Sequence, residues 1–395
     1  MASRTLISQV KHTRLFYTIY FYIGSLLINI IKLFVKPNDQ LIVFSSFSGK
    51  AFDDSPRALY EGMLNDPRFD HYELAWDFRN PDKFDIKRGV KIKTDTFDYY
   101  IKLLKARLWI TNVSMNRGLD FSGIHSFVFN TWHGSAIKKI GTDVKEGGGT
   151  FRSKSKQKRG DVLLAQGAYD VETFSRAYEM QKKDVLPIGL PRNDELVYNN
   201  QAEIINSLKN KLGIPSDKKV ILYAPTYRDY LKDDRKNSIF DMPFHIEKWE
   251  DKIGKDYVLL FRAHPDIAKV LHIVENEFVK DVSSYPHVND LMLVSDILIS
   301  DYSSIFFDYS ILGRPMLCFC YDYDRYTEER GVYFDIRKEL ACRNMMEEDH
   351  LINEISHIDW EARKRITIAF RDKYVDSYGD ATPKSLDFLY HVLNS

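Results

Sequence analysis

The feature that most constrains the fold is a regular alternation of short, apolar, β-rich runs with helical stretches from Gln40 onward. Each run ends in polar residues or glycine before the helical pattern begins. Apolar strands alternating with helices are typical of the parallel, doubly wound sheets of α/β proteins. In the first half, the expected strands cover residues 41–47, 72–78, 107–112, 126–134 and 161–167, and the segment 184–194 follows them.

The same pattern starts again near residue 216, which indicates a second sheet. A polar helical segment, Asn199 to Leu212, comes just before the restart. A chain of 395 residues also exceeds one ordinary core, so two domains are expected. The second set of expected strands covers residues 218–228, 257–265, 296–304 and 315–321. In such sheets ligands bind beyond the carboxyl ends of the strands, where most of the polar motifs of this chain lie.

The N-terminal segment 15–35 is apolar and long enough to raise the question of a membrane span. Its polar exceptions follow helical spacing and form one stripe: Thr18, Ser25, Asn29, Lys32 and, just beyond, Lys36. This pattern favours a helix in the membrane interface, with Arg4, Lys11 and Arg14 near anionic lipid. A helix packed on the protein itself and a true span are the alternatives. No small-x-small site follows, which disfavours a cleaved signal peptide.

Charge, cysteine content and missing motifs exclude several classes of function. Lys plus Arg and Asp plus Glu both number 56, so the whole chain offers no electrostatic case for binding nucleic acid. Cys318, Cys320 and Cys342 indicate buried thiols in a reducing compartment. The sequence contains no P-loop, no strand followed by GxGxxG and no GxSxG. Its DYD at residues 322–324 is more typical of a solvated turn than of a metal site. We therefore expect neither a metal nor a cofactor.

The most informative stretch is "SDYSSIFFDYSILGRP", residues 300–315. It predicts a strand end followed by a helix that Ser303 or Ser304 caps and Gly313 closes. The amides and hydroxyls at such a helix start suit a phosphate group, so we expect a phosphate site there. Simple capping by the two serines is the alternative.

Three other strand ends carry groups suited to phosphate. "RAHP" places Arg262 and His264 together, where a guanidinium binds phosphate oxygens and an imidazole donates a proton. "APTYR" offers Thr226 and Arg228, and "GLPRND" adds a further arginine, Arg192. Each motif is weak alone, and their shared position at strand ends is the stronger argument.

The segment "TWHGSAIKKIG", residues 131–141, places His133 at another strand end, with Lys138 and Lys139 close by. A single histidine of this kind is more often structural than catalytic. Because four other motifs point to the same inferred cleft, we expect His133 to be a general base. One of the two lysines is expected to face phosphate.

A glycine- and lysine-rich segment, residues 146–160, interrupts the first half. It predicts a positively charged loop. The loop is either simply solvated or a contact surface for a polyanionic acceptor or a membrane.

These motifs, in this order and spacing, resemble those of the CDP-glycerol glycerophosphotransferase family, the bacterial teichoic acid primases and polymerases. The segment "VFSSFSGKAFDDSPRALYEGM", residues 43–63, is similar to the first strand and helix of the family. The resemblance covers roughly residues 40–390. One departure is Ser135-Ala136, where many members have Thr-Pro, and the sequence does not explain it.

The resemblance implies a GT-B-like α/β fold, with two Rossmann-like domains facing a central cleft and an N-terminal amphipathic, membrane-associated helix. We expect a membrane-associated segment over residues 1–39, an acceptor domain over 40–200 and a CDP-substrate domain over 201–395. His133 and His264 are the expected catalytic residues. The expected substrate-binding residues are Lys138, Arg192, Thr226, Arg228, Arg262, Asp301, Ser303, Ser304 and Asp308.

The implied reaction moves glycerol phosphate or ribitol phosphate from a CDP-alditol to a hydroxyl of an undecaprenyl-type, lipid-linked teichoic acid acceptor and releases CMP. The implied location is the cytoplasmic face of the cell membrane, bound peripherally to its anionic surface. The oligomeric state stays open, a homo-oligomer included. Two alternatives are another GT-B enzyme, such as a nucleotide-sugar 2-epimerase or sugar transferase, and a non-catalytic protein that binds polyanions during cell-wall assembly.

Overall fold

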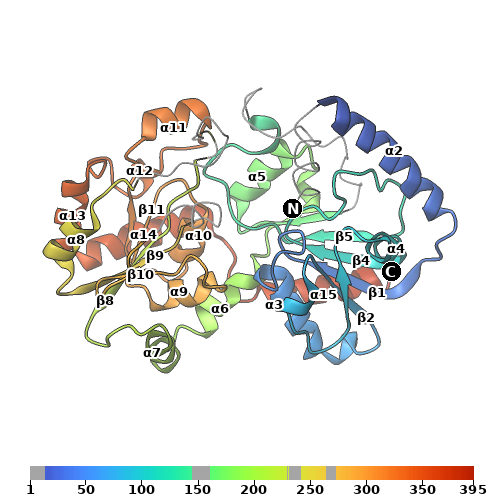
Figure 1. Ribbon diagram of the computed structural model, residues 1–395, viewed down its shortest axis with the longest axis horizontal. Helices are drawn as coiled ribbons and strands as arrows, with labels where there is room; N and C mark the ends of the chain where they lie inside the picture. Colours follow the sequence, from blue (N-terminus) through green and yellow to red (C-terminus); the bar gives the residue numbers. More distant parts are fainter. Residues whose placement is uncertain (1–13, 145–160, 229, 231–241, 264–272) are drawn as a thin grey trace.

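The computed structural model of this chain describes residues 14–144, 161–228, 230, 242–263 and 273–395. Two parallel sheets lie side by side (Figure 1), one in the first half of the chain, up to residue 200, and one in the second half. The expected α/β architecture with parallel sheets is therefore confirmed. The expected basic loop at 146–160 lies outside the described residues.

The first sheet has seven parallel strands in the order β3-β2-β1-β4-β5-β6-β7. This order reverses direction between β1 and β4, as in doubly wound folds, and ligands bind at such reversals. The strands are β1 (Asn38–Ser45), β2 (Glu73–Phe78), β3 (Val90–Lys93), β4 (Ala106–Thr111), β5 (Phe127–Asn130), β6 (Val162–Leu164) and β7 (Val185–Leu186).

The second sheet repeats the arrangement with five parallel strands in the order β10-β9-β8-β11-β12. Its reversal lies between β8 and β11, so the segments after these strands occupy the ligand-binding position of the fold. The strands are β8 (Lys219–Tyr223), β9 (Tyr257–Phe261), β10 (Val279–Asp281), β11 (Ile297–Ser300) and β12 (Met316–Cys318).

Helices connect the strands and bury apolar faces against the sheets. In the first half they are α2 (Arg14–Lys32), α3 (Asp54–Leu64), α4 (Phe97–Lys105), α5 (Ala168–Ala177) and α6 (Asp194–Tyr198). In the second half they are α7 (Ala202–Lys211), α8 (Ile246–Ile253), α9 (Val288–Val294), α10 (Ile305–Ser310), α11 (Tyr323–Glu329), α12 (Ile336–Glu339), α13 (Glu348–Ser356), α14 (Trp360–Tyr374) and α15 (Ala381–Leu393).

The last helix, α15, packs on the first sheet although it comes from the end of the sequence. Leu386 and Leu389 belong to the same apolar cluster as Leu59 and Met63 of α3. The carboxylate of Asp194 accepts hydrogen bonds from the first two amides of α15, at 3.0 and 2.7 Å. The expected domain boundary at residue 200 stays a prediction, and α15 ties the two halves together across it.

Helix α2 lies along the outer side of the first half (Figure 1). Two residues of its polar stripe, Ser25 and Lys32, face the protein. Ser25 is buried and its Oγ accepts from the Asp120 amide at 2.9 Å, while Lys32 Nζ donates to the Ser122 carbonyl at 3.0 Å. The opposite face is apolar and exposed: Phe16, Ile19, Tyr22, Ile23, Leu26, Leu27 and Ile30. Among the residues described, no helix combines the length and apolar character needed to cross a bilayer.

Candidate functional site

The loop that carries His133 follows β5 and is tied to the neighbouring strand β4. The Thr131 amide donates to the Thr111 carbonyl at 2.7 Å. Trp132 has a φ of +54°, a conformation uncommon for a bulky residue, and its amide donates to Asn130 Oδ1 at 2.9 Å. These contacts fix the turn that brings His133 to the carboxyl edge of the first sheet.

The imidazole of His133 has a defined tautomer because of its backbone partner. Its Nδ1 lies 2.8 Å from the carbonyl oxygen of Asn112, and a carbonyl only accepts hydrogen bonds. Nδ1 therefore carries the proton, and Nε2 of the neutral ring carries the lone pair. Burial lowers the pKa of His133, which keeps the ring neutral near pH 7. Nε2 is thus suited to accept a proton.

The residue after His133 touches the second half of the chain directly. Gly134 has a φ of +134°, and a Cβ at this position would lie 2.6 Å from Ser304 Oγ. Only glycine permits this approach. The His133 loop and the segment Ser303–Ser304 therefore meet, although they follow strands of different sheets.

The rest of the "TWHGSAIKKIG" segment also crosses to the second half. The Tyr333 amide donates to the Ile137 carbonyl at 2.8 Å, and the Lys139 amide donates to the Gly331 carbonyl at 3.1 Å. Lys138 forms an antiparallel bridge with Val332 between them. The predicted residue Lys138 thus lies in a backbone connection between the two halves of the chain.

On the second sheet, the segments after β8 and β11 are joined through Asp301. Its Oδ1 accepts from the amides of Thr226 and Tyr302, at 2.8 and 2.7 Å. The hydroxyl of Thr226 is buried and has no hydrogen-bond partner among the residues that the structure describes. Ser303 Oγ accepts from the Ile305 amide at 3.3 Å, so Ser303 caps α10 in part.

Arg228 lies behind this turn in a buried ion-pair cluster. Its guanidinium lies 2.8 Å from carboxylate oxygens of both Asp301 and Asp322, and its side chain is 1% exposed. Tyr302 and Tyr326 stack on each other and pack against the same guanidinium, each with its ring centroid 5.0 Å away. This arrangement braces the turn from behind, and it also engages the Asp322 of the DYD sequence.

Of the "RAHP" motif, Arg262 is described and His264 lies outside the described residues. Arg262 NH1 donates to the carbonyls of Val282 and Tyr285, at 3.2 and 2.7 Å. Burial lowers the pKa of this guanidinium. The structure thus places Arg262 at the carboxyl end of β9, beside the strand that leads to Thr226.

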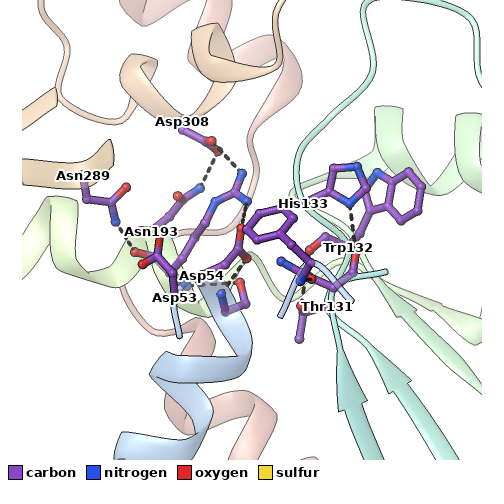
Figure 2. Close-up of polar contacts among 12 residues, drawn as sticks. Asp53, Asp54, Thr131, Trp132, His133, Asn193, Asn289 and Asp308 are labelled. Atoms are coloured by element: carbon purple, nitrogen blue, oxygen red, sulfur yellow. Dashed lines mark hydrogen bonds and ion pairs between the residues drawn. The ribbon is translucent and has the colours of Figure 1, made fainter. Parts of the chain in front are cut away.

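Arg192 lies between the two halves and pairs with a carboxylate from each. NH1 lies 2.7 Å from Asp54 Oδ2 at the start of α3, and NH2 lies 2.7 Å from Asp308 Oδ2 in α10. Asn193 Nδ2 donates to the other oxygen of Asp308 at 2.8 Å. Figure 2 shows Asp308, Asn193 and Asp54 gathered on one side of the site and His133 on the other. Burial raises the pKa of Asp308, and Arg192 opposes that shift.

The sequence did not single out several residues that shape the site: Asp54, Asn112, Gln166, Asp170 and Asn193. Asn112 and Gln166 are polar residues just after β4 and β6, which is a signal that sequence reasoning can use. Asp54 lies in the segment that resembled the first helix of the family, but its partner is distant in sequence.

The two parallel sheets, with their ligand-binding edges joined by the His133 loop, define a GT-B-like α/β protein. The profile of the CDP-glycerol:poly(glycerophosphate) glycerophosphotransferase family matches residues 27–383. The chain therefore belongs to this family of transferases, as its motifs predicted.

Two bacterial relatives show how the chain compares with proteins of known name. It is 36% identical over 337 residues to a teichoic acid poly(glycerol phosphate) polymerase of Staphylococcus epidermidis, covering 82% of this chain and 46% of that protein. It is 35% identical over 349 residues to a teichoic acid glycerol-phosphate transferase of Staphylococcus aureus, covering 85% of this chain and 88% of that protein. The chain thus spans about half the length of the first relative and most of the second.

Among solved structures, the chain is similar to the wall teichoic acid polymerase TagF, with a TM-score of 0.83 and 31% identity over 96% of this chain and 97% of that one. A co-structure of S. aureus MnaA with UDP also matches, with a TM-score of 0.56, 14% identity and coverage of 90% of this chain and 97% of that one. At 14% identity, the second similarity shows the fold alone.

The His133 geometry makes a prediction for nuclear magnetic resonance. In ¹⁵N spectra, the neutral ring should carry its proton on Nδ1, and its pKa should lie below about 6.5, the ordinary histidine value. The His133→Gln variant assigns the signal. A proton on Nε2, or a pKa above the ordinary value, would contradict this description of the site.

Proposed function

We propose that this protein transfers glycerol phosphate from CDP-glycerol, or ribitol phosphate from CDP-ribitol, to a hydroxyl of a prenyl-diphosphate-linked teichoic acid acceptor. CMP is the other product. The observation that carries the proposal is the contact between the His133 loop and Ser304, which brings the ligand-binding edges of both sheets together in a chain of this family. A solved histidine variant of TagF soaked with CDPG, 32% identical to this chain, supports the choice of donor.

In the proposed reaction, the acceptor hydroxyl oxygen attacks the phosphorus that bears the alditol. A new P–O bond forms while the bond to the CMP oxygen breaks, and CMP leaves with the electron pair of that bond. His133 Nε2 takes the proton of the attacking hydroxyl, and the Nδ1–H bond to the Asn112 carbonyl holds the ring in the required tautomer. Positioning and charge stabilisation provide most of the catalysis in phosphoryl transfer, so no covalent nucleophile is needed.

The donor is proposed to bind on the second sheet, in the domain assigned to residues 201–395, and the acceptor on the first, in the domain over 40–200. Ser303, Ser304 and Thr226 would donate hydrogen bonds to the phosphates of the CDP-alditol. The buried hydroxyl of Thr226 is available for this, since it has no partner within the described part of the chain. Arg262, Lys138 and His264 are proposed to supply further positive charge or donors, with His264 acting on the leaving group. Arg228 and Asp301 are proposed to act indirectly, by holding the turn that carries the serines.

The reaction itself is tested by supplying the purified chain with a prenyl-diphosphate-linked glycan and either CDP-glycerol or CDP-ribitol. We expect CMP release that depends on the acceptor, and product lengths that show whether one or many units are added. Failure to release CMP with both CDP-alditols would refute the proposed function.

Replacing the proposed base gives a second test. His133→Gln should lower the turnover number by about 10²–10⁴ because the attacking hydroxyl keeps its proton, while donor affinity stays within about threefold. The matched control is His125→Gln, at the opposite end of β5, where the side chain is exposed and pairs with Asp39. A loss below about threefold in His133→Gln would exclude the role of base.

The pH profile follows from the direction of the pKa shift. The base is active when neutral, so activity should fall as pH decreases through the pKa of His133. Because burial lowers that pKa, the acid limb should lie below about 6.5. An acid limb that is unchanged in His133→Gln would assign it to another group.

We also propose that the chain binds peripherally to the cytoplasmic face of the membrane through the exposed apolar face of α2. Seven large apolar side chains of this helix are at least 45% exposed, and Leu33 and Phe34 extend the face. The polar stripe is already satisfied by the protein, which leaves the apolar face for lipid.

Flotation with anionic lipid vesicles tests this location. Each buried aliphatic side chain contributes roughly 1.5–3 kcal/mol, so Ile23→Glu with Leu26→Glu should weaken vesicle binding by at least about tenfold. Tyr198→Glu is the control, because Tyr198 is 57% exposed on α6, away from α2. Equal binding by the double variant and the wild type would refute the role of α2.

A further inference from the structure

A continuous run of buried hydrogen bonds connects α10 with the loop that carries His133. From the second half, Asp308 Oδ1 accepts from Asn193 Nδ2 at 2.8 Å, and the same Nδ2 donates to Gln166 Oε1 at 2.9 Å. Gln166 Nε2 donates to Ser135 Oγ at 3.0 Å, and Ser135 Oγ donates to Asp170 Oδ2 at 2.7 Å. We call these five residues the relay. All of them are less than 5% exposed.

The directions of the hydrogen bonds made by Asn193 and Gln166 are fixed by chemistry. Asn193 uses its amide nitrogen for two acceptors, and Gln166 accepts with its oxygen and donates with its nitrogen. Rotating either amide by 180° would place two donors or two acceptors face to face. The relay therefore has one arrangement, and a break at one end disturbs the other.

The relay ends next to the proposed base. Ser135 is two residues after His133, and Gly134 between them lies against Ser304. At the other end, Asp308 belongs to α10, which directly follows Ser304. The relay and the Gly134 contact thus connect the same two segments by two independent routes.

Both carboxylate oxygens of Asp308 are engaged by side chains of the protein. Oδ2 pairs with Arg192 at 2.7 Å, Oδ1 accepts from Asn193, and the residue is 4% exposed. The role of Asp308 in the site is therefore to hold the side chains of Arg192 and Asn193. The hydroxyl of Ser135 is likewise engaged, since it both accepts and donates inside the protein.

We propose that Asp308 and Ser135 are positioning residues. They hold the imidazole of His133 at the correct position relative to the proposed donor-binding segment, Ser303–Ser304. This inference rests on the proposed function for its catalytic meaning. At position 135, where many family members have threonine, serine keeps the hydroxyl that makes this connection.

The test compares Asp308→Asn and Ser135→Ala with a matched control, Glu354→Gln. Glu354 pairs with Arg363 at 2.6 Å within the second half, so its change to an amide also breaks a partly buried ion pair. Because a displacement of about 1 Å can cost 10²-fold in rate, each relay variant should lower the turnover number by about 10- to 100-fold. The Kd for CDP-glycerol should stay within about threefold, and Glu354→Gln should keep its turnover number.

Hydrogen–deuterium exchange of the full chain gives a readout that does not depend on activity. Amides of residues 131–140 should exchange at least about tenfold faster in both relay variants and at the wild-type rate in Glu354→Gln. Ser135→Ala removes only one oxygen atom, so this variant still tests the proposal if Asp308→Asn does not fold.

The outcomes separate the two proposals. Absence of CMP release by the wild type refutes the proposed function, while the exchange rates still decide whether the relay holds the loop. Unchanged exchange at 131–140, or a turnover number that falls equally in Glu354→Gln, would overturn the assignment of Asp308 and Ser135.

Discussion

The arrangement of the site depends on one buried guanidinium, that of Arg192, held between Asp54 and Asp308. Each of the three side chains is less than 10% exposed, so none of these charges is well solvated by water. Removing one partner of such a group leaves a buried charge without compensation and costs about 3–5 kcal/mol. Arginine suits this position because it remains charged and presents donors to two carboxylates at once. The pair fixes α3 of the first half against α10 of the second.

This fixed contact matters because each sheet alone supplies only half of the proposed reaction site. The reversal between β1 and β4 presents Asn112, which orients His133, and the reversal between β8 and β11 presents Thr226 and the serines. Among the described residues, these edges are held together by the Arg192 pairs, the contact of Gly134 with Ser304, the backbone bridge of Lys138 with Val332, and the relay. These contacts hold the two halves in a fixed relation, which the proposed reaction requires.

The sequence predicted those parts of the fold that depend on local pattern. Apolar runs predicted the central strands, but not β3 and β10, which are short edge strands of four and three residues. The strand-end motifs predicted that the His133 loop lies close to Ser304, and that Arg192 lies close to the helix after Ser304. They did not predict the partners, because Arg192 and Asp308 are 116 positions apart and Arg228 and Asp322 are 94 apart. The spacing of polar residues likewise predicted the polar stripe on α2. Which way that stripe faces depends on contacts with residues 115–124, and these contacts are distant in sequence.

The most direct test of this account is a structure of the His133→Gln variant with CDP-glycerol bound. The account predicts that the donor phosphates contact Ser303 and Ser304, on the side that faces residue 133, with Arg192 still paired to Asp54 and Asp308. Donor phosphates bound away from residues 303–304, or a bound state in which the Arg192 pairs are broken, would contradict it.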